Sequence, residues 1–260
     1  MNNIDEIHQT VTGWIREAAD HIRSEINEQL SVKVKTTPND LVTNLDFETE
    51  KFIVSKIHAT FPTHKIVSEE GFGDDVTDMS DSIWFIDPID GTLNFVKQKE
   101  NFCIMLAYYE NGIGKLGYIY DVMKDKFYHV IRGEGAYCNN KQIKPILKRG
   151  LSEGLTALNS KLVSQHQNNA IKNILSNTLG LRLYGSAGIE AIEVISSRTV
   201  AYVASNLKPW DFAAANIFAE EMNAKLTDFN NQPIDLLKPC KIIIANQKAH
   251  EEIINIFKQS

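Results

Sequence analysis

The sequence has little of what marks a secreted, membrane-bound or metal-thiolate protein. Its 260 residues include only three cysteines, Cys103, Cys138 and Cys240, which are far apart, so neither a disulfide framework nor a zinc site is indicated. No uninterrupted apolar run reaches the roughly 18 residues that suggest a membrane-spanning helix. The first ten residues are polar and lack the pattern of a secretion signal. We therefore expect a protein of the reducing cytoplasm that does not act at a membrane.

Positive charge is also in deficit. Lys and Arg total 27 against 33 Asp and Glu, which gives a formal net charge of −6. Such a chain has no overall positive field, so general binding to DNA or RNA is not expected. The 43% hydrophobic and 23% charged residues are typical of a globular protein and exclude a disordered or collagen-like chain. The acids then form either a solvated surface or a site for cations, and their positions distinguish the two.

Hydrophobic periodicity in the first half of the chain predicts two helices followed by strands. Apolar residues three and four apart from Ile4 to Leu30 predict one long amphipathic helix. A second helical pattern follows Asp46 and stops at Pro62. Short apolar runs then end in acidic residues, and β-rich runs separated by turn residues predict an antiparallel meander. These runs are 65–68 and 83–86, then 102–109, 115–122 and 126–131.

The second half of the chain alternates between strand-like and helix-like segments. The strand-like segments are 155–158, 181–184, 199–203, 225–229 and 241–245, and the helix-like ones are 166–178, 186–196, 210–222 and a last helix to Phe257. This alternation predicts a mixed α/β layer. The change of rhythm places a boundary near 141–150, and no Gly/Ser/Pro-rich linker lies there. We therefore expect two α/β subdomains, 1–145 and 146–260, packed against each other.

The most informative acidic segment is Trp84–Phe95, which reads WFIDPIDGTLNF. An apolar strand delivers Asp87 at its end, and Asp90 follows three residues later, so a tight turn brings the two carboxylates together. Carboxylates are the ligands that Mg²⁺ prefers, with phosphate and water completing its shell. Backbone N–H groups at a helix start at Gly91-Thr92 suit a phosphate. The alternative is an ordinary capped turn, since Asp-Pro and Asp-Gly are common turn dipeptides.

Three further segments place acids near predicted element ends. Glu69 and Glu70 follow the preceding strand, Asp40 and Asp46 precede a helix, and Asp211 lies in the first turn of another helix. Each has an ordinary interpretation, as a solvated loop entry, a helix cap or a favourable interaction with the helix dipole. Two successive strands that end in acids favour a ligand site, because ligands in α/β sheets gather at the carboxyl ends of strands.

These segments together resemble the inositol monophosphatase family of lithium-sensitive, Mg²⁺-dependent phosphatases. The matching motifs, in family order, are DLVTNLD at 40–46, SEE at 68–70, DPIDGTLNF at 87–95 and WDFAAA at 210–215. The resemblance extends over nearly the whole chain, with a G-x-G-A-x-x-N run at 133–139 and Ile-Ala-Asn at 244–246. It implies a mixed α/β, sugar-phosphatase-like sandwich layered αβαβα, and a homodimer.

The resemblance also implies roles for individual residues. Glu70, Asp87 and the carbonyl of Ile89 would hold one metal ion, Asp87, Asp90 and Asp211 a second, and Glu70 would serve a third ion through water. Thr92 and Asp46 would orient and deprotonate a water held by the metal. The substrate contacts would be the Gly91 and Thr92 N–H groups, the loop Gly185-Ser186-Ala187, and Lys35 on a loop that folds over the site.

The implied chemistry agrees with these residue types, since two or three Mg²⁺ ions neutralise a phosphate monoester and lower the pKa of a bound water. One departure concerns specificity. Animal inositol phosphatases carry a glutamate seven residues before the helix aspartate, and here that residue is Ala204. Losing this acceptor favours a broader or bulkier substrate range. Nearby Lys208 either meets a second phosphate or is simply solvated, and we favour solvation.

The predicted function is therefore hydrolysis of a small phosphorylated alcohol, with inositol 1-phosphate first. Alternatives within the same chemistry are the 2′-phosphate of NADP(H), fructose 1,6-bisphosphate and a 3′-phosphorylated adenosine nucleotide. An alternative from another class is a non-catalytic, metal-binding regulatory protein. The presence of all the implied ligands and of Thr92 argues against that last alternative.

Overall fold

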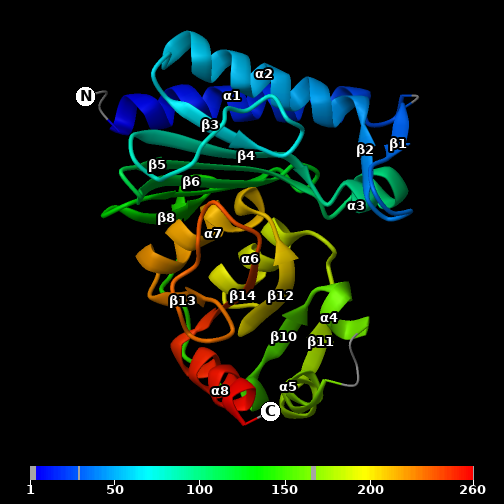
Figure 1. Cartoon of the computed structure of the whole chain (residues 1–260), viewed down its shortest axis with the longest axis vertical. Coiled ribbons are helices and arrows are strands. Elements are labelled where there is room, and N and C mark those ends of the chain that lie inside the picture. Colours follow the sequence, from blue (N-terminus) through cyan, green and yellow to red (C-terminus); the bar gives the residue numbers. More distant parts are fainter. Residues whose placement is uncertain (1–3, 29, 165–167, 260) are drawn as a thin grey trace.

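The computed structural model describes residues 4–28, 30–164 and 168–259, which form five layers (Figure 1). Helices α1 (Ile4–Glu25) and α2 (Asn44–Thr60) cover the outer face of a seven-stranded sheet. Helices α6 (Ala187–Ile195) and α7 (Pro209–Glu221) lie between this sheet and a five-stranded one, whose outer face carries α5 (Asn169–Asn177) and α8 (Gln247–Lys258). The expected mixed α/β fold, layered αβαβα, is confirmed.

The seven-stranded sheet follows the chain in order. Its strands are β3 (Lys65–Ser68), β4 (Ser82–Asp90), β5 (Cys103–Glu110), β6 (Ile113–Asp121), β7 (Lys126–Ile131), β8 (Gly135–Cys138) and β9 (Lys141–Gln142). Only β3 and β4 pair in parallel, and the rest form the predicted antiparallel meander. At the β5–β6 turn, Asn111 and Gly112 both have positive φ, as a two-residue hairpin turn requires.

The five-stranded sheet mixes parallel and antiparallel pairs. Its spatial order is β11 (Gly180–Arg182), β10 (Leu155–Leu158), β12 (Ala201–Leu207), β14 (Cys240–Asn246) and β13 (Ala224–Thr227). The first three strands are parallel, and β14 runs antiparallel to both of its neighbours. The remaining short elements are the hairpin β1 (Val32–Val34) and β2 (Leu41–Thr43), α3 (Thr92–Gln98), a 3₁₀ turn at Leu151–Glu153 and α4 (Ser160–Ser164).

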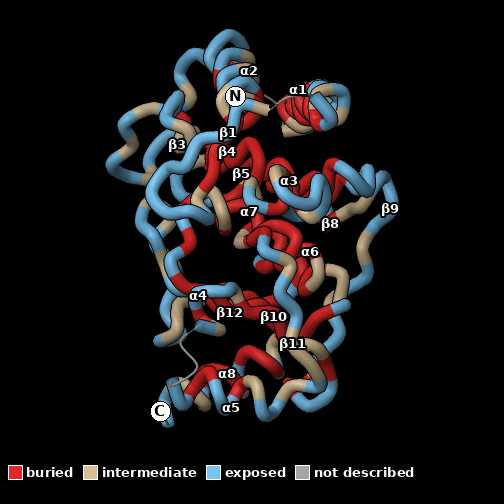
Figure 2. The backbone as a smooth tube through the Cα atoms, turned by 90° about the vertical axis from the view of Figure 1, so that its right-hand side faces the viewer, coloured by how far each residue is buried: buried red, intermediate tan, exposed pale blue. Residues whose placement is uncertain are grey.

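Three hydrophobic clusters hold the layers together, and Figure 2 shows the buried backbone concentrated in the two sheets and the helices between them. The closest approach is between α7 and β6. A Cβ atom at Gly117 would lie 2.9 Å from Val130 Cγ1 and 3.1 Å from the Ala214 carbonyl oxygen, so only glycine lets the helix pack this tightly. Helix α7 therefore packs closely against the sheet whose strand β4 carries Asp87 and Asp90.

Several predicted boundaries differ from the structure. The first helix ends at Glu25 rather than near Leu30, and the chain enters a turn while Ile26 stays buried. The helix predicted for 166–178 falls partly outside the described residues, and its described part begins after Asn168, whose side chain accepts hydrogen bonds from the first turn. Strand β4 continues past Ile86 to Asp90. No helix in the described ranges is long and apolar enough to cross a membrane.

Candidate active site

Three carboxylates from distant parts of the chain converge beside the end of β4. Asp87 and Asp90 belong to β4, and Asp211 lies in the first turn of α7. One oxygen from each lies within 4.8 Å of the others, and both β4 aspartates are buried. Such a set of oxygens matches the ligands of a divalent cation. The tight turn that the sequence suggested therefore exists, and it meets a helix from the second half of the chain.

A bulge in β4 turns both carboxylates to the same side. The pairing of β4 with β5 shifts register between Asp87 and Asp90, and the Ile89 N–H donates to Asp87 Oδ1 at 3.1 Å. In a regular strand, residues three apart point to opposite faces, so the extra residue is what brings the carboxylates together. Asp211 is fixed differently, because its Oδ2 accepts from the Lys208 N–H at 2.8 Å and caps α7. The sequence suggested only a favourable interaction of Asp211 with the helix dipole, and the structure adds this capping bond beside the cluster.

The start of α6 holds Asp90 in place. Asp90 Oδ2 accepts hydrogen bonds from Ser186 Oγ at 2.5 Å and from the Gly188 N–H at 2.7 Å, and Oδ1 accepts from the Ala187 N–H at 3.2 Å. Ser186 also caps α6 by accepting from the Ile189 N–H. Ser186 and Ala187, expected in a substrate loop, are buried and serve here to position Asp90, while Gly185 lines the open pocket.

Thr92 and Asp46 meet as the sequence suggested. Thr92 Oγ1 lies 3.1 Å from Asp46 Oδ1 and also 3.1 Å from the Ile89 carbonyl oxygen, so its hydroxyl donates to one of these acceptors. Asp46 Oδ2 accepts from both the N–H and the hydroxyl of Thr43, which fixes the carboxylate. Burial raises the pKa of Asp46 to about 6, against the lowering effect of the Thr43 hydrogen bonds.

Glu69, and not the expected metal ligand Glu70, lies beside the aspartates. Glu69 lines the pocket with the three aspartates, and its charge acts on both Asp87 and Asp211. Glu70 is outside the pocket lining, with a side chain that is 2% exposed and bonded to Lys35 Nζ at 2.5 Å. Lys35 Nζ also lies 3.0 Å from Glu69 Oε1. The geometry therefore favours Glu69, rather than the Glu70 assigned from the sequence, as the glutamate that faces the carboxylate cluster.

The electrostatics of the cluster favour a bound cation. Burial, together with the negative charges of Glu69 and Asp90, raises the pKa of Asp87 well above its usual range, and burial with Asp90 does the same for Asp211. Burial raises the pKa of Glu70 to about 7, against the lowering effect of Lys35. Buried like charges at this spacing destabilise one another unless protons or cations compensate them.

The open space beside the carboxylates is a pocket of about 500 Å³. Ile89, Gly91 and Thr92 line it together with Glu69, Asp87, Asp90, Asp211 and Gly185. Gly91 has φ = 96° directly before α3, a backbone conformation that suits glycine. Ala204 lies elsewhere, since it is fully buried in the core between the sheets, so it neither borders this pocket nor enlarges it. Lys208 is exposed, as we favoured, and its side chain is outside the lining.

Two positioning residues were not found from the sequence. Glu50 on α2 is fully buried and accepts hydrogen bonds from Ser68 Oγ and from the N–H groups of Glu70 and Phe72, so it fixes the loop that carries Glu69. Asn94 on α3 donates to the carbonyl oxygens of Asn101 and Tyr184 and ties two rims of the pocket together. The available signal for Glu50 was a glutamate next to the apolar stripe of the helix predicted after Asp46, although Asp46 and Thr49 are buried on the same face.

Comparison with known proteins gives consistent results. The model of the inositol monophosphatase family matches residues 3–260. Inositol-1-monophosphatase of Bacillus subtilis (strain 168) is 39% identical over 256 residues, which is 97% of each chain. An IMPase/NADP phosphatase complexed with Mg²⁺ and phosphate superposes with a TM-score of 0.88 and 32% identity over 97% of this chain and 95% of that one. A dual specific IMPase/NADP phosphatase bound with D-inositol-1-phosphate gives 0.89 and 31% over 98% and 96%.

Proposed function

The chain belongs to the inositol monophosphatase family and is a phosphoric monoester hydrolase, and from that premise we propose that its main substrate is inositol 1-phosphate, hydrolysed with two or three Mg²⁺ ions. The observation that carries the proposal is the convergence of Asp87, Asp90 and Asp211 within 4.8 Å of one another. The curated relative at 39% identity is itself an inositol-1-monophosphatase.

The residues fit Mg²⁺ well. The donors are oxygens alone, which suits a hard cation and disfavours zinc. We assign Glu69, Asp87 and the Ile89 carbonyl to one ion and Asp87, Asp90 and Asp211 to another, with Glu69 replacing the Glu70 of the sequence-based assignment. Bound Mg²⁺ supplies positive charge that offsets the phosphate dianion and makes a nearby water more acidic.

The chain's own groups orient the attacking water. Thr92 Oγ1 accepts a hydrogen bond from that water while its own proton points to Asp46 Oδ1, 3.1 Å away. A free threonine hydroxyl is too weak a base to act alone, so Asp46 is the group that receives the proton. Gly91 and Thr92 line the pocket, and we assign their backbone N–H groups to the phosphate. Lys35 is outside the pocket lining, and its ion pairs with Glu69 and Glu70 place its positive charge next to the site.

A panel assay tests the proposal. We expect phosphate release from inositol 1-phosphate in the presence of Mg²⁺, and its loss when EDTA is added. The same assay runs with NADP⁺, fructose 1,6-bisphosphate and 3′-phosphoadenosine 5′-phosphate. Turnover of none of the four esters by folded, Mg²⁺-loaded protein would overturn the proposal, and it would favour the regulatory alternative.

NADP⁺ is the second substrate we propose. The support is one solved relative, described as a dual specific IMPase/NADP phosphatase, at 31% identity over 98% of this chain. The pocket of about 500 Å³ is open enough for more than a single sugar ring. If NADP⁺ is hydrolysed at less than about one-hundredth of the rate measured with inositol 1-phosphate, the proposal of a second substrate is wrong.

We further propose a cytoplasmic homodimer. All three cysteines are free thiols in the structure, which suits a reducing compartment. Light scattering on the purified protein tests the dimer, and a monomeric mass at micromolar concentration would contradict it.

A further inference from the structure

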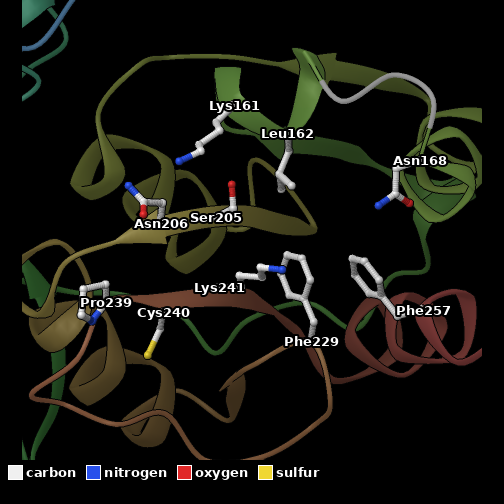
Figure 3. Close-up of a pocket in the computed structure, with 10 residues that line it drawn as sticks. All are labelled: Lys161, Leu162, Asn168, Ser205, Asn206, Phe229, Pro239, Cys240, Lys241 and Phe257. Carbon is white, nitrogen blue, oxygen red and sulfur yellow. The ribbon is translucent and has the colours of Figure 1, made fainter. Parts of the chain in front are cut away.

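A second pocket, of about 450 Å³, lies in the second half of the chain (Figure 3). It shares no lining residue with the pocket of the carboxylates. Its walls come from α4, the β12 strand, the start of β14 and α8, together with the loop after β13. This volume falls within the roughly 300–1,000 Å³ that small-molecule sites occupy. The pocket is therefore a distinct space that can hold a ligand of its own.

The lining of this pocket is positively charged in a chain of net charge −6. Lys161 and Lys241 both border it, and none of the described residues that line it is an aspartate or a glutamate. Among the described residues neither lysine forms an ion pair, unlike Lys35, Lys124 or Lys248. An ammonium group is a common partner of phosphate oxygens. These charges favour an anionic ligand.

A buried hydroxyl without a partner marks the same place. Ser205 is 6% exposed, and its Oγ has no hydrogen-bond partner among the residues that the structure describes. Figure 3 shows this oxygen pointing into the space that Lys161 and Leu162 border, with Asn206 beside it. The β12–β14 pairing shifts register between Ala204 and Leu207, which frees Ser205 and Asn206 from regular alternation. A buried hydroxyl without a hydrogen bond costs free energy. A ligand oxygen that accepts a hydrogen bond from Ser205 Oγ would remove this cost.

An aromatic wall completes the pocket. Phe229 and Phe257 stack with ring centroids 4.3 Å apart, and both side chains are only half-buried. Lys241 Nζ lies 6.0 Å from the Phe229 centroid, so a cation borders the aromatic surface. Flat heteroaromatic rings pack favourably against such phenyl groups. The lining therefore combines an anion site with a surface for a planar ring.

We propose that this pocket binds a nucleoside monophosphate. Its phosphate contacts Lys161, Ser205 and Asn206, and its base packs against Phe229 and Phe257. The site is independent of the hydrolytic reaction proposed above, since its lining contains none of the carboxylates.

Isothermal titration calorimetry with adenosine 5′-monophosphate tests this site, with the protein in EDTA so that no ester is hydrolysed. We expect saturable binding at one site per chain. The double variant Lys161→Ala/Lys241→Ala is expected to raise Kd roughly tenfold or more, because the contact of Lys161 with the phosphate and the nearby positive charge of Lys241 are both lost. Phe229→Ala is expected to weaken binding of the nucleotide but not of inorganic phosphate. Lys172→Ala, at an exposed position of α5, is the matched charge control and is expected to leave Kd unchanged.

A further variant separates this pocket from the active site. Asp87→Asn alters the carboxylate cluster and is expected to leave nucleotide binding intact. Circular dichroism confirms that each variant is folded. The proposal is overturned if the wild-type protein does not bind the nucleotide, or if Asp87→Asn changes the affinity while the double lysine variant does not.

Discussion

Glu69 and Glu70 are adjacent in the chain, but only Glu69 lines the pocket of the carboxylates, so we assign the metal-ligand role to Glu69. We predict that Glu69→Gln raises the Mg²⁺ concentration needed for half-maximal phosphate release roughly tenfold or more, because a ligand is weakened. Glu70→Gln is the matched control, since its carboxylate is bonded to Lys35 and lies outside the pocket lining. Mg²⁺ titrations of both variants measure the difference. A larger effect of Glu70→Gln would return the ligand role to Glu70.

Asp90 gives a second prediction at the level of single residues. Asp90→Asn is expected to lower turnover roughly a hundredfold or more, since it removes a charge that holds the second cation. The variant is expected to remain folded, because an Asn oxygen still accepts from the start of α6 and one like charge is removed from the cluster. Steady-state kinetics with inositol 1-phosphate, alongside circular dichroism, measures both effects. Near wild-type turnover with Mg²⁺ would rule out this metal assignment.

The sequence identified most of these residues but could not orient them. Asp87, Asp90, Asp211, Thr92 and Asp46 were predicted from motifs, and they come together in the structure. The sequence-based assignment named Glu70 alone, whereas Glu69 lines the pocket, and alternation along a strand could not separate the two because the strand ends at Ser68. What decides it is Glu50, on another element, which binds the backbone of Glu70. That contact joins residues 20 apart, and no local pattern reveals it.

Helix α6 acts as an element that positions Asp90, and this leads to a third prediction. Ser186→Ala removes both the cap of α6 and the 2.5 Å hydrogen bond to Asp90. We expect a loss of about 1–3 kcal/mol in the free energy of unfolding, because a buried carboxylate loses a donor. Urea denaturation measures this loss. Ser176→Ala, which removes an exposed side-chain hydrogen bond within α5, is expected to stay within about 0.5 kcal/mol of the wild-type protein. Equal effects of the two substitutions would show that α6 does not depend on this contact.

Elements with long regular periodicity were predictable, and short ones were not. Helices α1 and α2 and the β5–β7 meander were predicted because apolar spacing and turn residues act locally. The hairpin of β1 and β2, with exposed β1 and only three residues in each strand, carries no such signal. Its Lys35 end is held by the distant pair Glu69 and Glu70 instead. Tertiary contacts rather than local propensity determine this element.

At the scale of the whole molecule, the site joins the two halves of the chain. The seven-stranded sheet ends at Gln142, and the five-stranded sheet begins at Leu155. Because the boundary falls between the two sheets, we propose that residues 1–145 and 146–260 are the two subdomains of the chain. Asp90 from the first half accepts hydrogen bonds from α6 in the second, and Asp211 comes from the second half. We therefore expect that cation binding at this junction would stabilise the contact between the halves.

The stability of the whole molecule is expected to depend on pH in a way that Mg²⁺ reverses. Glu70 has a pKa raised to about 7, and those of Asp87 and Asp211 are raised well above their usual range. Groups with a raised folded-state pKa hold extra protons when folded, so the free energy of unfolding falls as pH rises through that pKa. Histidines with a lowered pKa, such as His129 and His250 at about 4, make the free energy of unfolding rise with pH instead. They do so only below about pH 6.5, where an unfolded histidine takes up its proton.

We therefore predict that, in EDTA, the free energy of unfolding decreases between about pH 6.5 and about pH 8. With saturating Mg²⁺ it is expected to hold steady or rise over the same range, because ionised carboxylates bind the cation more tightly. Urea denaturation at a series of pH values measures both curves. Asp87→Asn removes one titrating group and is expected to flatten the EDTA curve. A free energy that increases with pH in EDTA would mean that these carboxylates are already ionised without metal.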